Sequence, residues 1–144
     1  MEMVTKSILG YTAGAFDMFH IGHLNILKKA SELCERLIVG VSTDELILQN
    51  KGQTPIIPFL ERIQIIQSIK YVDMVYTQSV SNKLHAHSDL GFTEIYVGDD
   101  WQNTEIWIEY EKRFSERNVR VTYFPYTTHT SSSMIRSLIS KKLI

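Results

Sequence analysis

Two histidines, His20 and His23, stand three residues apart where an apolar run gives way to an amphipathic stretch. The apolar run predicts a strand over residues 8–12, and the amphipathic stretch predicts a helix from about Gly22 to Glu35. The free N–H groups and the positive dipole end at a helix start both favour an anion. Residues three apart share one side of the first turn. We therefore expect both imidazoles to donate hydrogen bonds to the phosphate oxygens of a nucleoside triphosphate.

The glycines around the two histidines fit this expectation. Gly14 would let the chain turn and let the backbone approach phosphate, and Gly22 would keep the surface between the imidazoles open. Two other interpretations of the histidines stay open. The rings could simply satisfy hydrogen bonds near a helix start. They could also be two ligands of a zinc site, although no third ligand stands at a typical spacing.

The composition is that of an ordinary globular chain. Its 144 residues are enough for one domain, which we place at residues 1–144, and 44% of them are apolar. The net charge of −1 leads us to expect no nucleic-acid partner. The single cysteine, Cys34, excludes an internal disulfide and favours a reducing compartment. Because no apolar run approaches the ~20 residues of a membrane span and no signal pattern is present, we expect a cytoplasmic protein without a membrane partner.

Strand-like and helix-like runs alternate along the chain. Strands are expected over residues 8–12, 36–41, 73–76, 94–97 and 119–124, and helices over residues 22–35, from 58 onward, and over 82–90, 104–117 and 131–141. The segment 42–57 is expected to be a polar loop. Strands separated by helices imply parallel pairing through crossovers. We therefore predict an α/β fold, a single Rossmann-like, doubly wound domain with a five-stranded, mainly parallel sheet that binds ligands beyond its carboxyl edge.

Four segments of the sequence together match a known family. They are Gly14-x-Phe16-Asp17 with His20-Ile21-Gly22-His23, then Val41-Ser42-Thr43-Asp44-Glu45, then Glu61-Arg62 leading to Tyr71-Val72-Asp73, and Gly98-Asp99-Asp100-Trp101. In this order they resemble the small nucleotidyltransferases with an HxGH signature, and most closely the glycerol-3-phosphate cytidylyltransferases. The resemblance covers about residues 8–140. It implies transfer of CMP from CTP to a phosphorylated alcohol such as glycerol 3-phosphate, release of pyrophosphate, a requirement for Mg²⁺, and a homodimer.

The resemblance also implies roles for particular residues. His20, His23 and Lys51 would be catalytic, and Lys51, in the loop after the second strand, would bring a mobile positive charge to the α-phosphate or the acceptor phosphate. Asp17 and Arg62 would bind the acceptor, or Arg62 would instead bridge the loop. The nucleotide would contact Thr12, Gly14, Ala15, Phe16, Gly22, Asp99, Asp100, Trp101, Thr127, Ser131 and Ser132. No residue is assigned to a protein-held metal.

One segment departs from the family pattern, which is Arg-Thr-x-Gly-x-Ser-Thr-Thr. Tyr126 stands in place of the arginine, and His129 stands in place of the glycine. A tyrosine offers neither a permanent positive charge nor a two-pronged clamp. Either another cation (Arg136, Lys51 or His129) takes over, or the acceptor differs from glycerol 3-phosphate.

Other interpretations stay open at this point. An adenylyltransferase of the same fold would use ATP and a different phosphorylated acceptor, although Gly98-Asp99-Asp100-Trp101 favours cytosine by resemblance. The chain is short for a relative of the class I aminoacyl-tRNA synthetases, and it has no Lys-Met-Ser-Lys-Ser-like segment. The intact histidine pair disfavours a non-enzymatic nucleotide-binding module. Asp99 and Asp100 could also form a cap or hold Mg²⁺, and the serines from Ser131 could serve only as a helix cap.

Overall fold

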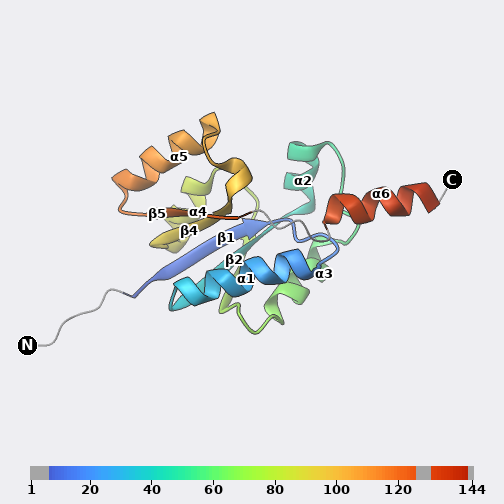
Figure 1. Cartoon of the computed structure of the whole chain (residues 1–144), viewed down its shortest axis with the longest axis horizontal. Helices are drawn as coiled ribbons and strands as arrows, with labels where there is room; N and C mark the ends of the chain where they lie inside the picture. Colours follow the sequence, from blue (N-terminus) through green and yellow to red (C-terminus); the bar gives the residue numbers. More distant parts are fainter. Residues whose placement is uncertain (1–6, 126–130, 143–144) are drawn as a thin grey trace, which may run out of the picture.

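A single parallel sheet organises the computed structural model, which describes residues 7–125 and 131–142. Its strands are β1 (Leu9–Gly14), β2 (Arg36–Ser42), β3 (Met74–Gln78), β4 (Glu94–Gly98) and β5 (Arg120–Phe124). They lie in the order β3-β2-β1-β4-β5, and every neighbouring pair is parallel (Figure 1). The predicted five-stranded, doubly wound α/β sheet is confirmed.

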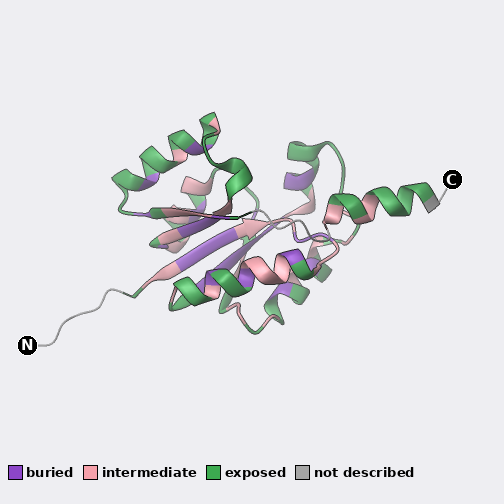
Figure 2. Ribbon diagram, in the orientation of Figure 1, coloured by how far each residue is buried: buried purple, intermediate pink, exposed green. Residues whose placement is uncertain are grey.

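Helices cover both faces of this sheet. They are α1 (Ile21–Leu33), α2 (Asp44–Lys51), α3 (Phe59–Gln67), α4 (Lys83–Leu90), α5 (Glu105–Glu116) and α6 (Ser132–Lys142), with a 3-10 turn, η1, at Asp99–Trp101. One core cluster joins α1 and α3 to the sheet through Leu27 and Ile66. The other joins α4 and α5 through Ala86 and Phe114. The central strands β1, β2 and β4 are largely buried between the two clusters, as their apolar runs require, whereas the edge strands β3 and β5 are more exposed (Figure 2).

The expected polar loop over residues 42–57 contains a helix, α2, and in this respect the prediction is wrong. The hydroxyl of Thr43 accepts a hydrogen bond from the Leu46 N–H at 3.1 Å and so caps the helix. Gly52 ends it in a left-handed conformation with φ of 71°. Only Leu46 and Ile47 of this helix are buried, so its apolar pattern is weak. The capping threonine and the terminal glycine were the available signals.

The order of the strands reverses between β1 and β4. β1 pairs with β2 through six residues, but it pairs with β4 only at Gly10 and Tyr11. Beyond Tyr11 the Thr12 hydroxyl bridges the two strands by donating to the Tyr96 carbonyl at 3.0 Å. In open α/β sheets such a switch point is where ligands bind, just outside the carboxyl ends of the strands.

Candidate active site

The signature histidines lie where β1 passes into α1, at the carboxyl edge of the sheet (Figure 1). The turn between the two elements is made by Phe16 and Met18, whose φ angles are 54° and 53°, and not by Gly14. The expectation that Gly14 supplies this turn is therefore wrong. A side chain at Gly14 would press on the Phe16 ring at 3.3 Å, so the glycine makes room for that ring. Positive φ in residues with side chains costs roughly 1–3 kcal/mol each and is typical of functional sites.

His20 and His23 cap α1 reciprocally. The Nδ1 atom of His20 accepts a hydrogen bond from the Gly22 N–H at 3.0 Å, and Nδ1 of His23 accepts one from the His20 N–H at 3.3 Å. The rings stack with their centroids 3.9 Å apart. Each imidazole thus takes a place that an oxygen-bearing side chain usually fills in a capping box. As a result, two backbone N–H groups that were expected to face a phosphate are already used.

The cap decides which nitrogen each ring can offer to a ligand. An Nδ1 atom that accepts a hydrogen bond carries no proton, so the proton of the neutral ring sits on Nε2. Both imidazoles therefore present an Nε2–H donor. Hydrogen bonds in a chain polarise one another, so the backbone donors strengthen these Nε2–H groups. The helix start therefore attracts an anion through the Nε2–H groups of the two rings.

The surroundings of the rings favour their neutral form. Burial lowers the pKa of His20 below its ordinary value of 6.5. Burial, together with the charges of His20 and Lys51, lowers the pKa of His23 to about 4, against an opposing effect of Asp17. Protonation of Nδ1 would also break the cap. At neutral pH the pair can therefore recognise an anion by hydrogen bonding without carrying a charge.

Lys51 lies at the last position of α2 and is exposed. The expectation that it sits in a loop is therefore wrong, because Gly52 ends the helix only after it. The negative end of the α2 dipole favours a cation at this position. The positive charge of Lys51 contributes to the lowered pKa of His23. Lys51 thus carries a cation at the end of the helix that follows β2, the strand next to β1.

Arg62 is buried beneath the site, with 1% of its surface exposed. Its Nε donates to the Ile57 carbonyl at 2.8 Å, and its Nη2 pairs with Asp44 Oδ1 at 2.7 Å. Its Nη1 donates to the carbonyls of Ala15 and Ser42 at 2.7 and 2.8 Å. These contacts correct the expectation of a bound acceptor phosphate and match the alternative role, a bridge between loops. The carbonyl of Ala15, a predicted nucleotide contact, accepts one of these hydrogen bonds, so its position is fixed by Arg62.

Asp17 and Thr12 also have protein partners where ligand contacts were expected. The Asp17 carboxylate is 7% exposed and accepts the N–H groups of Ile56 and Ile57, each at 2.8 Å. It also pairs with Arg136 at 3.0 Å. The Thr12 hydroxyl is used in the bridge to β4. Both side chains therefore shape the site from within and do not line it.

The segment expected to hold the nucleobase follows β4, the strand beside β1 at the switch point. Its turn is closed by the Gln102 N–H, which donates to the Asp99 carbonyl at 3.0 Å. Asp100 folds back over Gly98, where a Cβ atom would lie 2.6 Å from its Oδ1. Trp101 has 48% of its surface exposed and is available for stacking. The structure thus brings this segment and the histidines to the ends of neighbouring strands.

The predicted serines lie at the start of α6. Ser131 caps the helix, because its Oγ accepts the Met134 N–H at 3.1 Å. The Ser132 hydroxyl donates to the Asp17 carbonyl. This contact brings the start of α6 to the loop between β1 and α1, residues 15–20, which we call the signature loop. Thr127, Tyr126 and His129 lie outside the described residues.

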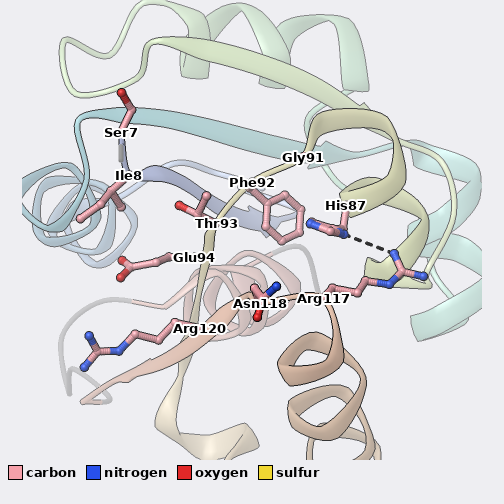
Figure 3. A pocket seen from close by; sticks show the side chains of 10 residues that line it. All are labelled: Ser7, Ile8, His87, Gly91, Phe92, Thr93, Glu94, Arg117, Asn118 and Arg120. Atoms are coloured by element: carbon pink, nitrogen blue, oxygen red, sulfur yellow. Dashed lines mark hydrogen bonds between the residues drawn. The ribbon is translucent and has the colours of Figure 1, made fainter. Parts of the chain in front are cut away.

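A separate hollow of about 330 Å³ lies at the opposite, amino edge of the sheet (Figure 3). It is lined in part by Ser7, Thr93 and Arg120, which stand at or just before the starts of β1, β4 and β5. Arg117 crosses it, donates to the Leu84 carbonyl at 3.1 Å and contacts the His87 ring at 3.2 Å. None of the signature residues lines this hollow.

Neither a metal cluster nor a membrane span is found within residues 7–125 and 131–142. No three His, Cys, Asp or Glu side chains in these ranges gather in a metal-binding arrangement. None of the helices there is long and apolar enough to cross a bilayer.

A family model described as cytidylyltransferase-like matches residues 11–138. The chain belongs to the cytidylyltransferase-like family. The match includes the histidine pair, the end of β4 and the start of α6, so the segments that meet at the carboxyl edge are those of the family.

Curated relatives within this family have different activities by name. The FAD synthase of Thermococcus sibiricus is 30% identical over 138 residues, which cover 94% of this chain and 93% of that protein. The ethanolamine-phosphate cytidylyltransferase of Arabidopsis thaliana is 42% identical over 74 residues, or 51% of this chain and 17% of that protein. The FAD synthase of Thermococcus kodakarensis is 41% identical over 76 residues, and the chain spans about half of its length, 51%.

Solved structures show the same fold. The lipopolysaccharide core biosynthesis protein of Thermoplasma volcanium GSS1 has a TM-score of 0.72 and 23% identity, covering 87% of this chain and all of that one. The pantoate-beta-alanine ligase of Francisella tularensis has a TM-score of 0.66 and 16% identity, covering 99% of this chain and 72% of that one.

The capping hydrogen bonds predict an unusual titration of His23. In nitrogen-detected NMR of the ring, we expect the Nε2–H tautomer at neutral pH and protonation with a midpoint near pH 4. Because the unfolded chain binds this proton near pH 6.5 and the folded chain only near 4, acidification across that range should destabilise the fold. An Nδ1–H tautomer, or a midpoint near 6.5, would contradict the capping arrangement.

The bridge made by Arg62 predicts a large loss of stability on conservative replacement. In Arg62→Lys a single ammonium group cannot reproduce four hydrogen bonds in fixed directions, so buried carbonyls lose their donors. We expect the free energy of unfolding, measured in urea, to fall by about 3–5 kcal/mol. Arg113→Lys is the matched control, since Arg113 forms an exposed pair with Glu109, and it should change stability by less than about 1 kcal/mol. Equal losses in the two variants would refute the bridge.

Proposed function

We propose that this protein transfers CMP from CTP to a phosphorylated alcohol such as glycerol 3-phosphate and releases pyrophosphate. The observation that carries the proposal is the pair of neutral imidazoles whose Nε2–H groups are left for a ligand by the cap. They lie at the switch point, where a nucleotide can reach from the start of α1 to the end of β4. The family match supports nucleotidyl transfer of this kind.

The proposed reaction is an in-line displacement at the α-phosphorus. An oxygen of the acceptor phosphate forms the new P–O bond, and the bond from the α-phosphorus to the bridging oxygen breaks. Pyrophosphate leaves with the electron pair of that bond. A phosphate monoester is already nucleophilic at neutral pH, so no general base is required. The protein has to position two anions and offset their repulsion.

The chain's own residues divide this work. The Nε2–H groups of His20 and His23 donate to phosphate oxygens where charge builds up in the transition state. Lys51 adds a positive charge from the end of α2, with a side chain long enough to follow the phosphates. Trp101 and the turn at Asp99 would receive the base, because carboxylate and carbonyl oxygens accept hydrogen bonds from the exocyclic amine of cytosine.

Mg²⁺ is expected to accompany the nucleotide. Mg²⁺ commonly keeps several waters and is held by substrate phosphates with one or two carboxylates, not by a dedicated protein cage. The ion would neutralise phosphate charge, and the residues named above would still orient the phosphates. A homodimer, a cytoplasmic location and the lack of a nucleic-acid partner also remain part of the proposal.

One finding favours a second candidate, adenylyl transfer from ATP. A relative matched almost end to end is an FAD synthase, and FAD contains an adenine nucleotide. Glycerol-3-phosphate-type cytidylyl transfer is preferred here because the Gly98–Trp101 segment resembles the cytidylyltransferases. The two candidates share the phosphate site and differ in the nucleobase end and the acceptor.

Pyrophosphate release measured with each nucleotide decides between them. With Mg²⁺ and glycerol 3-phosphate, we expect turnover with CTP and little with ATP, and no turnover when the acceptor is omitted. Phosphorylated amino alcohols and FMN should be tested in parallel as acceptors. Preference for ATP with FMN would replace the first candidate by the second. Binding of the nucleotide without release of its pyrophosphate in the presence of any acceptor would contradict both.

The double role of His20, cap and donor, allows a variant that separates the two. Asparagine is a favourable N-cap, so His20→Asn should keep α1 stable but lose the Nε2–H donor. We expect turnover to fall on the order of 10²–10³-fold while the urea midpoint changes little. His23→Ala should likewise remove activity, and His85→Ala, an exposed histidine on α4, should leave it unchanged. Near-normal turnover in His20→Asn would show that the imidazole does not act on the phosphates.

A further inference from the structure

The last helix, α6, is docked in an unusual way. It lies beyond the carboxyl edge of the sheet, on the side toward which β1 points, and does not cover a face of the sheet (Figure 1). Three of its apolar side chains, Met134, Leu138 and Ile139, remain 47%, 51% and 38% exposed, and Ile135 is partly buried. Figure 2 shows most of this helix as exposed. It therefore buries little apolar surface, and polar contacts contribute to its position.

Most of those contacts are made to one residue, Asp17. The Ser132 hydroxyl donates to the Asp17 carbonyl, and Arg136 Nη2 donates to Asp17 Oδ2 at 3.0 Å. The same Nη2 donates to the Thr54 carbonyl at 3.2 Å. These three are the side-chain hydrogen bonds that join α6 to the rest of the described chain. Asp17 itself is 7% exposed and belongs to the signature loop three residues before His20.

The carboxylate of Asp17 also holds the segment that leads from Lys51 to α3. Its two oxygens accept the N–H groups of Ile56 and Ile57. The carbonyl of Ile57 accepts a hydrogen bond from Arg62, so the backbone of Ile57 is held through both its N–H and its carbonyl. One buried carboxylate thus joins the loop of the imidazole pair, the segment after Lys51 and the start of α6. Its negative charge is matched by the guanidinium of Arg136.

We propose that Asp17 is a positioning residue that locks Arg136 and the amino end of α6 against the imidazole pair. We call the Asp17–Arg136 ion pair and the Ser132–Asp17 hydrogen bond the lock. They leave part of Arg136 able to contact a ligand. Its Nε and Nη1 groups have no partner among the described residues, and 28% of its side chain is exposed. A guanidinium held in this way supplies a second cation, fixed to the loop that carries the histidine pair. This role rests on the proposed function, whose substrates are anions.

The lock makes a specific kinetic prediction. In Asp17→Asn the shape is kept, but the charge is lost and the amide nitrogen faces a backbone N–H. A misplacement of about 1 Å in such a site can cost ~10²-fold, and we expect kcat/KM for the nucleotide to fall by about this factor. The part of this loss that passes through Arg136 should be absent once Arg136→Gln is present, so the double variant should lose clearly less than the product of the two single losses. Losses that multiply in the double variant would overturn the proposal, and Arg136→Lys should restore part of the activity.

A distance measurement tests the lock without any activity. In a Cys34→Ser background, spin labels at Lys29→Cys on α1 and Ser140→Cys on α6 report the placement of α6, and both sites are exposed. We expect a narrow distance distribution by double electron–electron resonance, broadened by Asp17→Asn. Arg136→Gln, which removes the same ion pair from the partly exposed side, should broaden it equally and covers the case in which Asp17→Asn fails to fold. Glu116→Gln on α5 is the exposed control and should leave it narrow.

The two measurements separate this proposal from the proposed function. An unchanged distance distribution in both ion-pair variants overturns the lock, whatever the kinetics show. If the parent protein turns over neither CTP nor ATP, the proposed function fails. The distance distributions would still show whether Asp17 holds α6.

Discussion

The reciprocal hydrogen bonds between the two histidine rings and the backbone at the start of α1 are the constraint on which the site depends. They fix the rings against each other and take two backbone donors that would otherwise face a ligand. They also leave the Nε2–H groups of His20 and His23 as the groups that can meet a phosphate. The capped helix start and the Nε2–H tautomer are consequences of the same two contacts, and burial of the rings lowers the pKa of both.

Around this pair the molecule uses buried charge to hold segments that are far apart in sequence. Arg62 donates to carbonyls of three segments. Asp17 accepts from the N–H groups of one of these, Ile56–Ile57, and also pairs with Arg136 of the last helix. Buried ionic groups of this kind add little net stability over apolar packing, but removing one partner is costly. Their effect is to make the positions of the Lys51 helix and of α6 depend on the signature loop. The positions of Lys51 and Arg136 are thereby set by the loop that carries the histidine pair.

The five strands and their mainly parallel, doubly wound arrangement followed from the sequence, because apolar runs alternate with helix-like segments and those of the central strands are largely buried. The helix α2 did not, since only Leu46 and Ile47 are buried and its caps are its main signal. The roles of Asp17 and Arg62 could not follow from spacing, because their partners come from distant segments that meet only in the fold. Histidine is not a usual capping residue, so the sequence indicated two ligand-binding rings but not the hydrogen bonds that orient them.

A crystal structure with Mg²⁺ and a CTP analogue that resists cleavage at the α-phosphate tests the central claim most directly. The account predicts phosphate oxygens at about 2.7–3.2 Å from Nε2 of both His20 and His23, with both Nδ1 atoms still accepting from the backbone. The base would lie beside Trp101 at the end of β4. A triphosphate seated elsewhere, or rings turned so that Nδ1 faces the phosphates, would contradict it.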